Sequence, residues 1–406
     1  MTAPLDAALS EAALVRDLTE LIGRPAEADA LRLTHRLARR LGLDAELHEE
    51  DLAELRRAEG YPGEEVERDS LQSLFVTVPG RDPGAPRLVV NGHVDVVPPG
   101  TAPWTHPPFS ATVRDGRVYG RGAADMKAGV VAALHALAAA REAGGPPGDV
   151  VLQVVAGEED GGIGAFAALR RDADFAGCVI PEPTGGALVC ATAGALTFRL
   201  RLTGRAAHAS RRLDGVSALD RFWPVHQALA GLEERLNADR GHPLMAGQAL
   251  PYPLSIGRLT TGEWSSTVPD ELVCEGRLGV PIGRTLASVR EDFEAAVRQA
   301  AAGTGPPPEV TWSGGQFAPA ETPVTHRLVE SVRRHVADVT GRPATPVGVP
   351  YGTDLRLYAA RGIPGVLYGP GDIEQAHAVD EYVPVADILT TARVLLRLAL
   401  TFGSTG

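Results

Sequence analysis

His93 and Asp95 are the first residues along the chain whose types and spacing suit chemistry. They follow an apolar run, Val89-Val90, and the strand-breaking pair Asn91-Gly92. Residues i and i+2 of an extended backbone point to the same side, so both side chains share a face at or just past the carboxyl end of a strand, where open α/β sheets place active sites. Three interpretations stand: a metal ligand with the carboxylate that orients it, a general base with its aspartate, or a structural pair.

Acidic residues also follow each of the next three predicted strands. Together with His93 and Asp95, four successive strands thus end in residues that could bind a metal ion. Because the carboxyl ends of parallel strands lie at one edge of a sheet, we expect these groups to meet. Converging carboxylates without a cation repel one another strongly, so the pattern predicts a divalent metal ion, and zinc accepts His, Asp and Glu alike. The acids are Asp125 in the glycine-rich turn 120–127, Glu158 and Glu159 after the apolar run 150–155, and Glu182 after the strand 177–180.

Composition and charge exclude several classes of partner. The chain has 406 residues, 44% of them hydrophobic, and a formal net charge of −12. This length allows two domains with a large core, and the composition is typical of a soluble globular protein. The negative charge argues against nucleic acid or an anionic membrane as a partner. The three cysteines have no C-x-x-C spacing, and we expect reduced core thiols in a reducing compartment, the cytoplasm.

We expect neither a signal peptide nor a membrane-spanning segment. Residues 1–20 have no basic segment followed by an apolar core, as a secretory signal would have. We also expect no run of about 20 apolar residues, the length that crosses a bilayer as a helix.

The predicted elements describe an α/β fold interrupted by an α+β unit. Strands and helices outside the interruption predict a mixed, mostly parallel sheet with helices on both faces. The interruption follows the order β-α-β-β-α-β. We therefore expect a catalytic domain in two parts, 1–194 and 316–406, and an inserted domain over 195–315. The inserted elements are strand 196–204, helix 216–239, strands 252–260 and 272–281, helix 286–302 and strand 308–313.

With these motifs placed, the chain resembles the dinuclear-zinc amidohydrolase and exopeptidase family of acetylornithine deacetylase, succinyl-diaminopimelate desuccinylase, aminoacylase and carboxypeptidase G. The resemblance covers nearly the whole chain, including the inserted domain, and rests on five motifs in matching order. They are H-x-D at 93–95, G-R-G-x-x-D-M-K at 120–127, the Glu pair at 158–159, Glu-Pro at 182–183 and a late histidine, His377. The family fold is a zinc-exopeptidase-like catalytic domain with an inserted lid and dimerisation domain.

The resemblance implies a centre of two zinc ions that activates water for amide hydrolysis. In it, Glu158 is the general base that takes a proton from water and passes it to the leaving amine, and Asp95 orients His93. Cobalt or manganese could replace zinc. The implied ligands are His93 and Glu182 on one ion, Glu159 and His377 on the other, and Asp125 between the two ions.

The inserted domain supplies substrate contacts in this family. The pattern G-x-x-x-H-A at 204–209 makes His208 the residue implied to reach the partner subunit's substrate, and hence implies a homodimer formed through this domain. Arg277 matches an arginine that holds a substrate carboxylate, although its position alone suits an ordinary strand-surface arginine equally well. Ser266 stands where many members have Asn, three residues before Pro269, and this departure concerns the contact that selects the substrate.

These residues favour a metal-dependent deacylase, similar to acetylornithine deacetylase, that cleaves an N-acyl amino acid or a similar small N-acyl compound. A dipeptidase or carboxypeptidase of the same family is the alternative, and the stretch 263–269 favours the deacylase. A more distant alternative is a metal-binding regulatory protein without catalysis, against which the presence of Glu158 argues.

Overall fold

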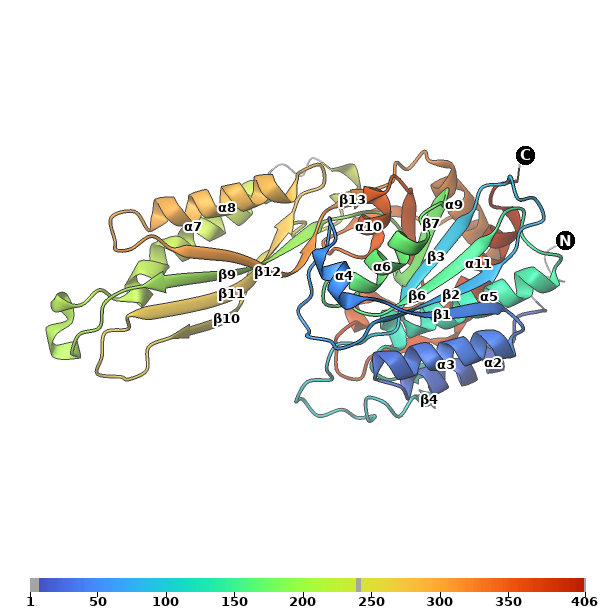
Figure 1. Cartoon of the computed structure of the whole chain (residues 1–406), viewed down its shortest axis with the longest axis horizontal. Coiled ribbons are helices and arrows are strands. Elements are labelled where there is room, and N and C mark those ends of the chain that lie inside the picture. The colour runs from blue at the N-terminus through green and yellow to red at the C-terminus, as the bar shows by residue number, and fades with distance from the viewer. Residues whose placement is uncertain (1–6, 239–241, 405–406) are drawn as a thin grey trace.

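The computed structural model describes residues 7–238 and 242–404. Within these residues the molecule is elongated, with a nine-stranded sheet at one end and a four-stranded sheet at the other (Figure 1). Each sheet packs against its own helices and has its own buried apolar clusters. The structure is therefore of the mixed α/β type that the sequence predicts, with a second α+β unit.

The larger sheet has the order β1-β2-β6-β3-β7-β15-β8-β13, with β14 beside β8. Its centre, from β6 to β15, is parallel, whereas the pairs at both edges are mostly antiparallel. The carboxyl ends of the parallel strands thus lie at one edge of the sheet. The strands are β1 (Asp44–Glu49), β2 (Gln72–Val78), β3 (Leu88–His93), β6 (Val150–Val155), β7 (Gly177–Pro183), β8 (Leu188–Thr192), β13 (Ala320–Glu321), β14 (Pro346–Val349) and β15 (Gly365–Gly369).

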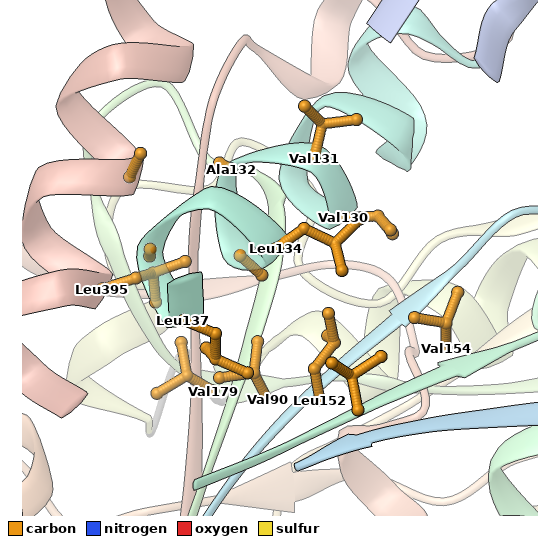
Figure 2. Close-up of a cluster of buried hydrophobic side chains, with 14 of the residues drawn as sticks. Val90, Val130, Val131, Ala132, Leu134, Leu137, Leu152, Val154, Val179 and Leu395 are labelled. Carbon is orange, nitrogen blue, oxygen red and sulfur yellow. The ribbon is translucent and has the colours of Figure 1, made fainter. Parts of the chain in front are cut away.

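Helices cover both faces of this sheet, because alternate residues of its buried strands point to opposite sides. Val90, Leu152 and Val179 pack with α5 and α11 on one face (Figure 2). Their neighbours Val89 and Val151 pack in the cluster of α6 and α10 on the other. The helices are α2 (Glu11–Ile22), α3 (Glu27–Arg40), α4 (Leu52–Arg57), α5 (Ala128–Glu142), α6 (Ile163–Arg171), α9 (Arg327–Thr340), α10 (Leu355–Ala360) and α11 (Val385–Thr401).

The expectation of no long apolar run is wrong for one segment. The helical residues Ala123–Glu142 are long and apolar enough, by length and composition, to cross a membrane. The most apolar window of this segment is 100% buried inside the fold. Its helix, α5, is apolar on all sides because the sheet covers one face and helices such as α11 cover another.

The smaller sheet contains β9 (Gly194–Thr203), β10 (Leu254–Thr261), β11 (Glu271–Val280) and β12 (Glu309–Phe317), in the order β10-β11-β9-β12 and antiparallel throughout. Helices α7 (Ala218–Ala238) and α8 (Leu286–Ala300) pack on one face of it (Figure 1). The order of these elements agrees with the predicted β-α-β-β-α-β unit. The predicted domain boundaries at 195 and 315 stay a prediction.

Several short elements were not predicted. A third sheet joins β16 (Tyr382–Pro384), β5 (Arg117–Tyr119) and β4 (Thr112–Arg114). These strands have three residues each, which is too short for an alternating pattern to show. Strand β1 at the sheet edge has the mostly polar sequence DAELHE, because one of its long sides has no neighbouring strand and most of its side chains are partly or fully exposed.

Candidate metal centre

His93 ends strand β3, and its ring is held from one side by Asp95. His93 Nδ1 lies 3.1 Å from the backbone oxygen of Asp95 and 3.5 Å from its Oδ1. A backbone carbonyl only accepts hydrogen bonds, so Nδ1 carries the proton and Nε2 is the nitrogen left for a metal ion. The predicted contact between His93 and Asp95 is present. The shorter of its two distances runs to the backbone carbonyl oxygen of Asp95 rather than to its carboxylate. Asp95 Oδ2 accepts a hydrogen bond from the backbone N–H of Glu159 at 3.1 Å, which ties the next loop to His93.

Asp125 lies between two histidines. Its Oδ1 is 3.1 Å from His93 Nε2, and its Oδ2 is 3.6 Å from His377 Nε2. Two atoms that bind the same zinc ion at about 2.0–2.2 Å lie roughly 3–3.5 Å apart, so the separations on both sides of this carboxylate suit one ion each. A carboxylate in this position can bridge two cations.

The expectation that Asp125 follows a strand of the main sheet is wrong. It lies in the turn between β5, a strand of the small third sheet, and α5. The chain reverses there through Gly122, whose φ is +80°, and a Cβ at this position would lie 2.5 Å from Val96 Cγ1. A residue without a side chain is therefore required for Asp125 to reach the edge where β3 ends.

Glu159 and His377 come from two loops that meet beside Asp125. His377 Nε2 lies 2.9 Å from Glu159 Oε2 and 3.2 Å from Oε1. Glu159 follows β6, whereas His377 belongs to the loop between β15 and β16 and has a positive φ of 61°. The structure thus brings together residues that are far apart in the sequence.

Glu182 lies within β7, next to His93. Its Oε1 is 3.7 Å from His93 Nε2. The five predicted ligands form two groups that share Asp125, and within each group the ligand atoms lie within 4.8 Å of one another. The first group is His93, Asp125 and Glu182, and the second is Asp125, Glu159 and His377.

The electrostatics of the site call for a cation. Burial, followed by the charge of Asp125, raises the pKa of Glu159 to about 7 and the pKa of Glu182 well above its usual value. Burial opposes a charged imidazole at His93, yet Asp95 and Asp125 raise its pKa well above the usual value. The neighbouring groups of the protein therefore supply too little positive charge to balance these buried carboxylates. Imidazole and carboxylate donors of this kind suit a borderline or hard divalent ion, so the residues fit a metal pair.

Glu158 lies beside both groups and belongs to neither. Its side chain is buried, and burial, followed by the charge of Asp354, raises the pKa of its carboxyl well above the usual value. Asp354 is itself buried, and neither of its carboxylate oxygens has a hydrogen-bond partner within the described ranges. Nothing in the local sequence indicates that Asp354, directly before the short helix α10, lies near the Glu pair.

The structure places His208 and Ser266 next to each other. The backbone N–H of Ala209 donates to Ser266 O at 2.9 Å, and His208 forms an isolated bridge with Thr267. The His208 ring is exposed, with Nδ1 2.8 Å from Ser210 Oγ. Arg277 lies on β11, and within residues 7–238 and 242–404 its guanidinium has no hydrogen-bond or ion-pair partner. No hydrogen bond or ion pair between described residues joins these three residues to the candidate metal ligands.

Comparisons with known proteins give a consistent picture. A sequence profile described as peptidase family M20/M25/M40 matches residues 89–401. The chain is 32% identical over 321 residues to a succinyl-diaminopimelate desuccinylase of Gluconacetobacter diazotrophicus, covering 75% of this chain and 78% of that protein. It is 29% identical over 343 residues to an acetylornithine deacetylase of Photorhabdus laumondii, covering 80% and 82%. The YXEP protein of Bacillus subtilis, described as a dinuclear metal-binding peptidase, has the same fold, with a TM-score of 0.68, 16% identity and coverage of 98% and 99%.

Proposed function

The chain belongs to peptidase family M20/M25/M40, and from this membership we propose that it cleaves the amide bond of an N-acyl amino acid or a similar small N-acyl compound. Two relatives at 29% and 32% identity are named for such deacylations and align with three quarters or more of the chain. The observation that carries the proposal is Asp125, whose two oxygens face two different histidines beside the buried Glu158.

We propose zinc as the metal, with cobalt or manganese as substitutes. His93 and Glu182 would hold one ion, Glu159 and His377 the other, and Asp125 both. When bound, such a pair supplies Lewis acidity, which polarises a carbonyl group and lowers the pKa of a water molecule. The five donors support this assignment because they fall into two groups around one shared carboxylate.

Glu158 would transfer a proton from the attacking water to the leaving amine. Its carboxylate lies next to a ligand, Glu159, yet stays outside both donor groups. It is therefore free to accept a proton from the attacking water and to pass it to the nitrogen of the leaving amine. Asp95 holds His93 from behind, so that the imidazole keeps one orientation throughout the reaction.

Substrate recognition would come from the smaller sheet unit. Arg277 is a partly buried cation without a partner among the described residues, which suits a substrate carboxylate. We propose that the exposed His208 completes the site of a second copy in a homodimer formed through this unit. Exposed Trp223 and Trp264 on the same unit support such an interface. The three cysteines are buried free thiols, which is compatible with the proposed location in the cytoplasm.

The test is hydrolysis by the zinc-loaded protein of N-acetyl and N-succinyl amino acids, compared with dipeptides and tripeptides. We expect release of the free amine from acyl amino acids, and a Glu158→Gln variant should lose at least about 100-fold in turnover while keeping its zinc. Preferential cleavage of peptides would instead identify a peptidase. Full activity of Glu158→Gln would show that another group carries the proton.

A further inference from the structure

The carboxylate of Glu381 is surrounded by four donors from the turn that carries Asp125. Glu381 Oε1 accepts hydrogen bonds from the backbone N–H groups of Ala124 at 2.9 Å and Asp125 at 3.2 Å. Glu381 Oε2 accepts from the backbone N–H of Gly122 at 3.1 Å and from Arg121 Nη1 at 2.7 Å. Since a carboxylate has about four acceptor positions, this one is fully used by a single turn.

Arg121 connects the same turn to the loop of His377. Besides Glu381, its guanidinium donates to the backbone oxygens of His377 and Ala378, each at 3.3 Å. The guanidinium of Arg121 also lies over the ring of Trp104, with Cζ 5.1 Å from the ring centre. The side chains of Arg121 and Glu381 are only 3% and 1% exposed, so water does not compete for these contacts.

The two groups of candidate ligands differ in what holds them. His93 and Glu182 stand on β3 and β7, which are neighbouring parallel strands, so the sheet fixes their separation. Asp125 lies on the turn that follows β5, and His377 lies on the loop that precedes β16. These two short strands pair with each other, but neither residue stands on a strand itself. His377 has a φ of 61°, a conformation that residues other than glycine rarely adopt, so its loop needs outside contacts to keep its shape.

We propose that the Arg121–Glu381 pair positions Asp125 and His377 for the second of the two metal ions. This inference rests on the proposed two-ion centre and adds two positioning residues to it. Among the described residues, neither Arg121 nor Glu381 forms a hydrogen bond with the side chain of a candidate ligand. Both act on the backbone of the segments that present Asp125 and His377. The first ion depends on the pair through one ligand, the shared Asp125, whereas the second ion depends on it through two, Asp125 and His377.

The test is a titration of the metal-free protein with Zn²⁺, followed by calorimetry, together with the zinc content after dialysis. A Glu381→Gln variant keeps the volume of the side chain but offers one acceptor oxygen, so at least two of the four donors lose their partner. We expect it to bind the second ion about 10–100-fold more weakly, the usual effect of removing such outer contacts, and to weaken the first ion less because only one of its ligands is affected. Arg121→Lys keeps the charge but loses the planar fork whose two nitrogens donate separately to Glu381 and His377, and should behave in the same way.

Double variants identify the ion that is affected. Adding Glu381→Gln to His377→Ala should cost little beyond His377→Ala alone, because both act on the same ion. Adding Glu381→Gln to Glu182→Gln should weaken both ions. If Glu381→Gln instead adds its full effect to that of His377→Ala and little to that of Glu182→Gln, the proposal is wrong.

Asp17→Asn is the matched control for a merely structural effect. Asp17 forms a buried contact with His135, 3.0 Å long, between side chains that are 1% and 6% exposed. This variant should lose thermal stability and keep both ions. If the wild type binds two ions and Glu381→Gln and Arg121→Lys bind both equally well, the positioning role is wrong. If the wild type binds fewer than two ions, the two-ion centre itself is wrong.

Discussion

Arg68 holds Asp160, the residue directly after Glu159, through two parallel hydrogen bonds. Arg68 Nη1 donates to Asp160 Oδ2 at 3.1 Å, and Nη2 donates to Oδ1 at 3.0 Å. The backbone N–H of Val66 also donates to Asp160 Oδ2, at 2.8 Å. Because these side chains are only 7% and 8% exposed, the segment around Arg68 clamps the loop that carries the Glu pair onto the body of the protein.

Arg68→Ala should therefore lower the free energy of unfolding by about 3–5 kcal/mol, the usual cost of leaving one partner of a buried ion pair alone. Urea denaturation of the metal-free protein measures this. Arg199→Ala is the control, because its pair with Glu275 is half exposed and should cost less than about 1 kcal/mol. Equal effects of the two substitutions would contradict the clamp.

Asp125→Asn should leave the protein able to bind at most one metal ion at a time. An amide offers one acceptor oxygen, so it cannot bridge two cations as the carboxylate can. We expect metal analysis at saturation to find at most one ion and turnover to fall at least 100-fold, the low end for loss of a catalytic group. Asp115→Asn, at a side chain that is 80% exposed, should keep both ions. Full activity with a single ion would show that Asp125 is not a bridge.

Asp17 should contribute a pH-dependent part of the stability. Burial opposes its ionisation, but His135, Arg40 and Arg16 together hold the pKa of Asp17 below its ordinary value of 3.8. A carboxyl with a lowered folded-state pKa stabilises the fold above the unfolded-state pKa and loses this effect as the pH falls through the folded-state pKa. The difference in free energy of unfolding between the wild type and Asp17→Asn should thus shrink as the pH falls below 3.8. A difference that grows on acidification would reverse the assignment.

Mixed dimers test whether His208 acts on the neighbouring subunit. Glu158→Gln and His208→Ala chains should each be inactive alone, but after subunit exchange one site of a mixed dimer has an intact Glu158 of its own and an intact His208 from the other chain. At equal amounts we expect about a quarter of wild-type activity, since half of the dimers are mixed and each has one complete site. Continued inactivity after verified exchange would place His208 in its own chain's site or outside catalysis.

The sequence alone determined the kinds of groups in the centre and most of the elements that carry them. His93 and Asp95 lie two residues apart at the end of an apolar strand, and this spacing makes them neighbours whatever surrounds them. The central strands were predicted from short uninterrupted apolar runs and the long helices from apolar residues at helical spacing, and both signals lie in consecutive residues.

Tertiary structure decided how these groups meet. Asp125 was expected at a strand end, and it reaches His93 and His377 from a turn that Glu381 holds through contacts across more than half the chain. The Arg68–Asp160 clamp and the buried Asp354 depend in the same way on segments distant in sequence. The apolar periodicity of a segment indicates which face of a helix or strand is buried. It does not indicate which distant part of the chain packs against that face. The donors of the centre could therefore be predicted from the sequence, whereas the residues that hold them in place became visible only in the folded chain.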